Sequence, residues 1–203
     1  MLLENERCQV HRLGPGSCLE LFQSQRLLLL SAGGTLREEL SCNLLQVPEG
    51  NLHAAWEPFS TKKVRLRGLD GMFYIVQVYG THTFLAPSTL ALDDGVRTDV
   101  GTKLLIENAL VRVWAFEVEA GRACHVHRHV RDYFFLNMVE SNTLALDQRG
   151  EPDQNATASR QEEGKLTFVR VRGPSYPVHG LVNVGLQTFR QFVVEFQQPL
   201  SRL

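Results

Sequence analysis

The chain has 203 residues, 43% hydrophobic and 21% charged, with a formal charge of −1 at pH 7. This composition is typical of a globular protein and gives enough chain to bury a core in one large domain or two small ones. The balanced charge argues against a nucleic-acid partner, which usually requires a basic face, and no apolar run approaches the roughly 20 residues that span a bilayer.

The N-terminal segment "MLLENERCQV" carries charges where a secretion signal needs an apolar region, so we expect a cytoplasmic protein. Further along, the apolar run Leu27–Leu30 is typical of a buried strand, and a short helix is expected near residues 36–45. The segment "KVRLRG" at 63–68 alternates polar and apolar residues, which indicates a half-buried strand.

The second half also favours strands. Residues 111–118 form an apolar segment rich in β-branched and aromatic residues, and residues 166–172 and 190–196 alternate with a period of two. In the last segment, the two expected faces hold Phe192, Val194 and Phe196 on one side and Gln191 and Glu195 on the other. Short strands separated by turn residues predict an all-β sandwich or barrel.

The two halves of the chain resemble each other. "LLENERCQV" near the start resembles "LLIENALVRV" at 104–113, and "RGLDGMFYIVQVY" at 67–79 resembles "VGLQTFRQFVVEF" at 184–196. The spacing between matching segments grows along the chain, which a longer loop in the second half explains. We therefore predict two similar β units, residues 1–90 and 91–203.

The segment "GRACHVHRHVRDY" at 121–133 places three histidines at alternate positions, His125, His127 and His129. Alternate residues of a strand project to one face, so His127 and His129 can converge on one metal ion. Imidazole suits Fe(II), Zn, Ni, Cu and Co, so the spacing alone does not select the metal. A further ligand must come from another strand, and His179 in "YPVHGLVNVG" lies in the same half of the chain.

These two histidine segments resemble the cupin superfamily, small β-barrels that hold a metal inside. The first cupin motif is a Gly, five residues, His-x-His, three or four residues and a Glu; the second ends in Pro, His, three residues and Asn. The residues that match are Gly121, His127, His129, Pro177, His179 and Asn183. The resemblance covers roughly residues 104–196. It implies an all-β, cupin-type double-stranded β-helix, or jelly roll, in two repeats.

The sequence departs from the cupin pattern at the carboxylate. The motif's Glu would fall at Tyr133 or Phe134, so the resemblance implies a neutral ligand set of His127, His129 and His179, as in three-histidine iron cupins. Two alternatives stay open. Asp132 supplies a carboxylate if a bulge turns it inward, and His125 is a substitute ligand or faces the substrate. The N-terminal half has no such motif and is interpreted as a degenerate repeat.

The resemblance implies a metal-binding protein, with Fe(II) favoured and Zn, Ni, Mn and Cu as alternatives. The predicted activity is that of a mononuclear non-haem iron dioxygenase acting on a small organic acid, thiol or dicarbonyl compound, with Tyr133 and His125 as candidates for proton handling. The alternatives are a non-catalytic binding protein for a small ligand, a cupin isomerase or lyase, and a structural dimerisation barrel. The expected partners are a small molecule and, as an open alternative, a second copy. Strand parity places Phe135, Trp114 and Phe192 around the predicted pocket.

Overall fold

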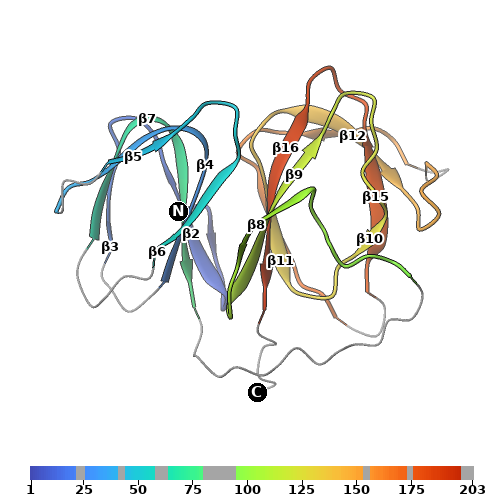
Figure 1. The fold of residues 1–203 in the computed structure, drawn as a ribbon, viewed down its shortest axis with the longest axis horizontal. Helices are drawn as coiled ribbons and strands as arrows, with labels where there is room; N and C mark the ends of the chain where they lie inside the picture. The colour runs from blue at the N-terminus through green and yellow to red at the C-terminus, as the bar shows by residue number, and fades with distance from the viewer. Residues whose placement is uncertain are drawn as a thin grey trace. The chain divides into compact units, whose positions relative to one another are not determined.

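The computed structural model describes residues 1–21, 26–40, 44–57, 64–79, 95–152, 156–172 and 176–197, and these residues form strands, turns and loops without a helix. They make up two compact units, Met1–Thr81 and His82–Leu203 (Figure 1). A search for a long apolar helix able to cross a membrane finds none in the described residues. The predicted boundary between residues 90 and 91 lies outside the described residues and stays a prediction.

The N-terminal unit is one antiparallel sheet of seven strands, in which β7 and β4 are the long central pair. Its order is β1-β2-β7-β4-β5, with β3 on β7 and β6 on β4. The strands are β1 (Leu3–Glu4), β2 (Cys8–Leu13), β3 (Cys18–Leu21), β4 (Arg26–Glu38), β5 (Leu44–Val47), β6 (His53–Glu57) and β7 (Val64–Val78). The apolar run Leu27–Leu30 lies in β4, as predicted, and is buried.

The helix expected near residues 36–45 is wrong for the described residues of this segment, 36–40 and 44–45, which form strands and a turn. Leu36 belongs to β4, and it faces Leu45 of β5 across an antiparallel pair. The side chain of Leu36 is buried in the core of this unit, and Leu45 packs against that core. Pairing with neighbouring strands therefore overrides the local helical spacing of the leucines.

The C-terminal unit has two antiparallel sheets, which together form a jelly roll. One has the order β14-β11-β16-β9-β8 and the other β10-β15-β12-β13. The strands are β8 (Lys103–Glu107), β9 (Val111–Val118), β10 (His127–Arg128), β11 (Tyr133–Asn137), β12 (Ser141–Leu146), β13 (Ser159–Gln161), β14 (Leu166–Val169), β15 (Val178–Asn183) and β16 (Phe189–Phe196). The strand predicted at 111–118 coincides with β9.

The internal repeat is visible in matching turns. The side-chain oxygen of Asn5 accepts hydrogen bonds from the backbone N–H groups two and three residues later, at 2.8 and 3.0 Å. Asn108 makes the same two bonds at 2.9 and 3.1 Å. Gly16 in "GPGSC" and Gly121 in "EAGRAC" occupy matching places in the two halves of the chain, and both have φ of 73°, a left-handed conformation that favours glycine. The two-repeat prediction is confirmed by these shared turns and by the antiparallel pairs β2–β7 and β9–β16.

Candidate metal centre

The three histidines of the two motifs meet inside the C-terminal unit. His127 and His179 are direct partners in the antiparallel pair of β10 and β15. The Nε2 atom of His129 lies 3.2 Å from Nε2 of His127 and 2.9 Å from Nε2 of His179. Within the described part of the chain, these three residues form the one cluster of His, Cys, Asp or Glu groups with metal-binding spacing.

Backbone contacts fix this convergence. The N–H group of His129 donates to the carbonyl oxygen of Pro177 at 3.0 Å, which ties the end of β10 to the start of β15. The Nδ1–H group of His127 donates to the carbonyl oxygen of His125 at 3.1 Å. This bond sets the tautomer of His127 and leaves the lone pair of its Nε2 atom directed at the cluster.

Burial keeps the three rings neutral. It lowers the pKa of His127 to about 4 and that of His129 to about 2, with the neighbouring imidazoles adding to the effect, and it lowers the pKa of His179 as well. The neutral imidazole is the form that binds metals. The three buried imidazoles are therefore in the protonation state in which their nitrogen lone pairs can bind a metal cation.

The spacing of the nitrogens also fits a single metal ion. Two imidazole nitrogens at about 2.1 Å from one ion lie about 3.0 Å apart at a right angle and about 3.4 Å apart at the tetrahedral angle. The Nε2–Nε2 separations of 2.9 and 3.2 Å in the structure agree with these values. Without an ion the three Nε2 atoms cannot all satisfy one another. His127 donates through Nδ1, so its Nε2 atom can only accept, and the Nε2 atom of His129 can donate to one neighbour or accept from one, not both.

A cavity of about 240 Å³ opens beside the histidines. The apolar part of its lining is Val100, Phe116, Phe135, Ala145, Leu181, Phe189 and Val193, and the hydrogen-bonding part is Thr143, Thr157, Ser159, Gln161 and Gln191. Phe135 lines it as predicted. The expectation for Trp114 and Phe192 is wrong: neither lines the cavity, and Phe192 points to the opposite face of β16 from Phe189, Gln191 and Val193.

Tyr133 also lines the cavity, and its ring stacks on His129 with centroids 3.9 Å apart and an interplanar angle of 12°. Burial, followed by the charge of Glu195, raises the pKa of Tyr133 to about 12. The hydroxyl group therefore stays protonated at neutral pH and can act as a hydrogen-bond donor in the cavity.

His125 and Asp132 lie outside the cluster. The Nε2 atom of His125 is 2.8 Å from the carbonyl oxygen of Asp99, and its ring is not part of the cavity lining. The carboxylate of Asp132 accepts a hydrogen bond from the backbone N–H group of Val171 at 2.8 Å. The alternative in which Asp132 supplies a metal ligand is therefore not realised in this structure.

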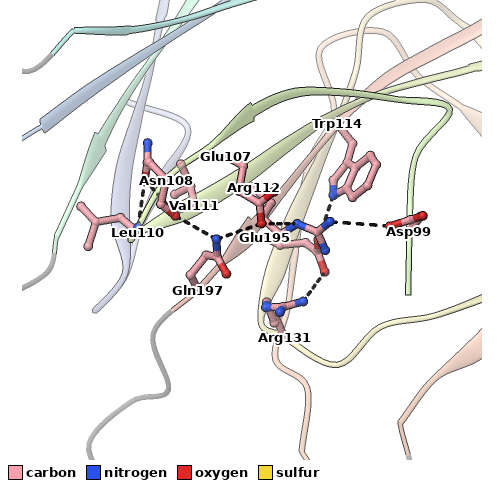
Figure 2. Close-up of polar contacts among 10 residues, drawn as sticks. All are labelled: Asp99, Glu107, Asn108, Leu110, Val111, Arg112, Trp114, Arg131, Glu195 and Gln197. Carbon is pink, nitrogen blue, oxygen red and sulfur yellow. Dashed lines mark hydrogen bonds and ion pairs between the residues drawn. The ribbon is translucent and has the colours of Figure 1, made fainter. Parts of the chain in front are cut away.

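A buried carboxylate close to the site, Glu195, was not predicted from the sequence. Glu195 was expected on the polar face of its strand, but its side chain is fully buried, and it pairs across the sheet with Tyr133. The indole N–H group of Trp114 donates to it at 2.8 Å, and Arg112 and Arg131 lie 3.7 and 3.8 Å away (Figure 2). Burial raises the pKa of Glu195, against the opposing effect of these three partners. Polar and apolar residues alternate along this strand, and such a pattern does not reveal that other parts of the protein cover both of its faces.

Asn183 of the second motif is a structural residue. Its side-chain N–H groups donate to the carbonyl oxygens of Val118 and Gln187, each at 2.8 Å, and its Oδ1 atom accepts from Ser141 and Gly185. These bonds join β15 to β9 and β12. Asn183 therefore links the two sheets on either side of the cavity.

No protein-family model and no curated protein matches the sequence. Solved structures do resemble it. A cupin 2 conserved barrel domain protein from Leptotrichia buccalis matches with a TM-score of 0.51 and 9% identity over 96% of this chain and 86% of the other. An IolB-like protein from Salmonella typhimurium LT2 matches with a TM-score of 0.58 and 10% identity, over 96% of this chain and 84% of the other. An oxalate decarboxylase matches with a TM-score of 0.52 and 16% identity, over 97% of this chain and 70% of the other.

The architecture and these similarities define a jelly-roll protein with an internal repeat. The chain has the fold of these cupin proteins, as the two motifs indicated, and its C-terminal unit carries three histidines positioned to hold a divalent metal ion.

Proposed function

We propose that His127, His129 and His179 hold one divalent metal ion, with Fe(II) favoured, and that the protein is a non-haem iron dioxygenase acting on a small organic acid, thiol or dicarbonyl compound. The observation that carries the proposal is the convergence of three neutral Nε2 atoms on one wall of a cavity. A neutral ligand set leaves the full charge of the ion available to an anionic substrate.

Iron bound there supplies Lewis acidity and a redox partner for dioxygen. The chain's own residues do the rest. Tyr133 holds the ring of His129 in place by stacking and keeps a proton on its hydroxyl group, from which it can donate to a substrate oxygen. The phenylalanines of the lining, Phe116, Phe135 and Phe189, exclude water from the reacting groups. His125 acts on the site through its carbonyl oxygen, which orients His127.

The cavity lining also bears on the alternatives. An isomerase or lyase usually needs a base to remove a proton from carbon. Among the described residues of the lining, the ionisable side chains are the three histidines and Tyr133, and no carboxylate is present. This favours chemistry that depends on the metal, or simple retention of a ligand, over acid–base isomerisation. The non-catalytic binding protein therefore stays the second candidate. A homodimer and a cytoplasmic location stay predictions.

Oxygen uptake by the Fe(II)-loaded protein tests the dioxygenase proposal. The substrates are cysteine, mercaptopropionate and acetylacetone, and the variants are His179→Ala and, as a matched control, His11→Ala in the N-terminal unit. The proposal expects uptake with one of these substrates, its loss in His179→Ala and its retention in His11→Ala. Tight ligand binding without uptake supports the binding protein instead. Equal uptake in His179→Ala means that iron bound elsewhere is responsible.

A further inference from the structure

The cavity has a second polar region, set apart from the histidines. The side chain of Gln191 on β16 donates to the Oδ1 atom of Asn137 at 2.9 Å, and Asn137 donates to the Oε1 atom of Gln161 at 3.4 Å. Gln161 in turn donates to the hydroxyl oxygens of Thr143 and Ser159 at 2.9 and 3.2 Å. This amide network connects the two sheets, since Gln191 and Asn137 belong to one and Gln161 and Thr143 to the other.

The network lies at the end of the cavity away from the metal ligands. Gln191 is the strand partner of Asn137, whereas Tyr133, which stacks on His129, is the partner of Glu195, four residues further along β16. Four residues of a strand span about 13 Å. Between these ends, the lining consists of apolar side chains such as Phe135 and Val193.

Hydrogen bonds fix the direction of each amide in the network. The Nδ2 group of Asn137 donates to the backbone carbonyl oxygen of Glu162 at 3.2 Å, and a carbonyl oxygen can only accept. The Oδ1 atom of Asn137 must therefore face Gln191 as an acceptor, and Gln191 must present its N–H group to Asn137. The Oε1 atom of Gln191 accepts no hydrogen bond from any residue that the structure describes.

Gln191 is almost entirely buried, with 8% of its surface exposed, and it lines the cavity. Its Oε1 atom is not fully enclosed by protein atoms, so a ligand or water in the cavity can supply the donor that the described residues do not. Arginine and lysine are absent from the described residues of the lining. The distal end of the cavity therefore complements a hydrogen-bond donor and offers no countercharge to a second anionic group.

We propose that the cavity selects a small, mainly apolar ligand that binds the metal through oxygen or sulfur at one end and presents an uncharged O–H or N–H donor to Gln191 at the other. Gln191 is then the residue that determines specificity, and Asn137 is a positioning residue that fixes its amide. This inference rests on the proposed metal centre and narrows its substrate class. It disfavours dianionic acids, because a second carboxylate would meet the amide oxygen of Gln191. The volume of about 240 Å³ lies below the range of drug-sized pockets, so the ligand is small.

Paired chelating probes test this inference. One member of each pair is an ω-hydroxyalkanehydroxamic acid, and the other has a methyl group in place of the terminal hydroxyl group. Chain lengths of about four to eight carbons cover the distance along the cavity. Affinities are measured from the visible absorption bands of the Co(II)-loaded protein, whose intensity and position change when the hydroxamate binds the ion.

We expect the hydroxyl probe to bind about threefold to tenfold more tightly than its methyl partner at the best chain length, as one net hydrogen bond allows. The Gln191→Leu variant should lose this preference while keeping Co(II). The control Gln187→Leu alters an exposed glutamine and should keep both. The paired comparison in the unchanged protein decides the claim even where Gln191→Leu does not fold.

Equal or tighter binding of the methyl probe at every chain length would overturn the inference, and so would an unchanged preference in a folded Gln191→Leu variant. In both cases the bound Co(II) would leave the metal proposal intact. Failure of the protein to bind Co(II) would overturn the metal proposal, and this inference with it.

Discussion

Acidifying the metal-free protein tests whether the histidine cluster is buried in its neutral form. Burial lowers the pKa of His127 from its ordinary value of 6.5 to about 4 in the folded protein. The unfolded chain therefore takes up a proton below pH 6.5 that the folded chain does not. The contribution of the neutral His127 side chain to the free energy of unfolding is fully present above pH 6.5 and is lost as the pH falls toward 4. At pH 5, His127 alone lowers the free energy of unfolding by about 2 kcal/mol.

The measurement is urea unfolding in the presence of a chelator, at about pH 7.5 and at pH 5, for the unchanged protein and for His127→Gln, which has no ionisable side chain at this position. We expect the loss of stability between the two pH values to be smaller in His127→Gln by about 2 kcal/mol. The control is Val182→Ala, whose side chain lies on the opposite face of β15 from His179. It should lower stability equally at both pH values. An unchanged pH dependence in His127→Gln would refute the reasoning.

Two further predictions concern the frame around the site, and a third concerns the N-terminal half of the chain. Asn183→Ala should lower the free energy of unfolding by about 3 kcal/mol in urea titrations, because it leaves buried partners of Asn183 unpaired, whereas the exposed neighbour variant Asn142→Ala should change it by less than about 0.5 kcal/mol. Gly121→Ala should cost about 1 kcal/mol by thermal denaturation. The cost comes from the backbone, because a φ of 73° is unfavourable for a residue with a side chain. An added Cβ atom meets nothing within 4 Å, so a much larger loss of stability would contradict this account. The N-terminal half of the chain, residues 1–90, should bind no metal, and an ion on His11, His53 or His82 in a crystal structure of the metal-loaded protein would contradict this.

The two motifs made the histidine cluster predictable because their ligands follow strand geometry. Alternation places His127 and His129 on one face, and the second motif brings His179 into register opposite His127. The turn at Gly121 was also predictable from its place in the motif, since the left-handed conformation there favours glycine.

The interior of the C-terminal unit was harder to predict. In β16, alternation separated Gln191 and Glu195 from Phe192 correctly, but the face that carries Phe192 was expected to line the pocket. Both faces of this strand are covered, and the polar face lies inside the barrel, where Trp114, Arg112 and Arg131 compensate Glu195. Such compensation comes from other strands, so a pattern along a single strand cannot reveal it.

The helix expected at residues 36–45 failed for a related reason. The spacing of the leucines suits a helix locally, but Leu36 belongs to a long strand whose stability comes from its pairing with β7 and β5. Non-local pairing of this kind decides the outcome when local preferences are weak. The positions of the ligands were thus predictable, whereas the composition of the cavity around them required the structure.

The metal content of the protein tests the central claim most directly. The protein is purified without added metal, loaded with a divalent ion, desalted and measured by elemental analysis, together with the His127→Ala/His129→Ala variant. The matched control is His11→Ala/His53→Ala, which removes two histidines from the N-terminal unit. We predict about one ion per chain in the unchanged protein and in the control, and none in His127→Ala/His129→Ala. A folded His127→Ala/His129→Ala variant that keeps a stoichiometric ion would contradict the account, because the metal would then be held elsewhere.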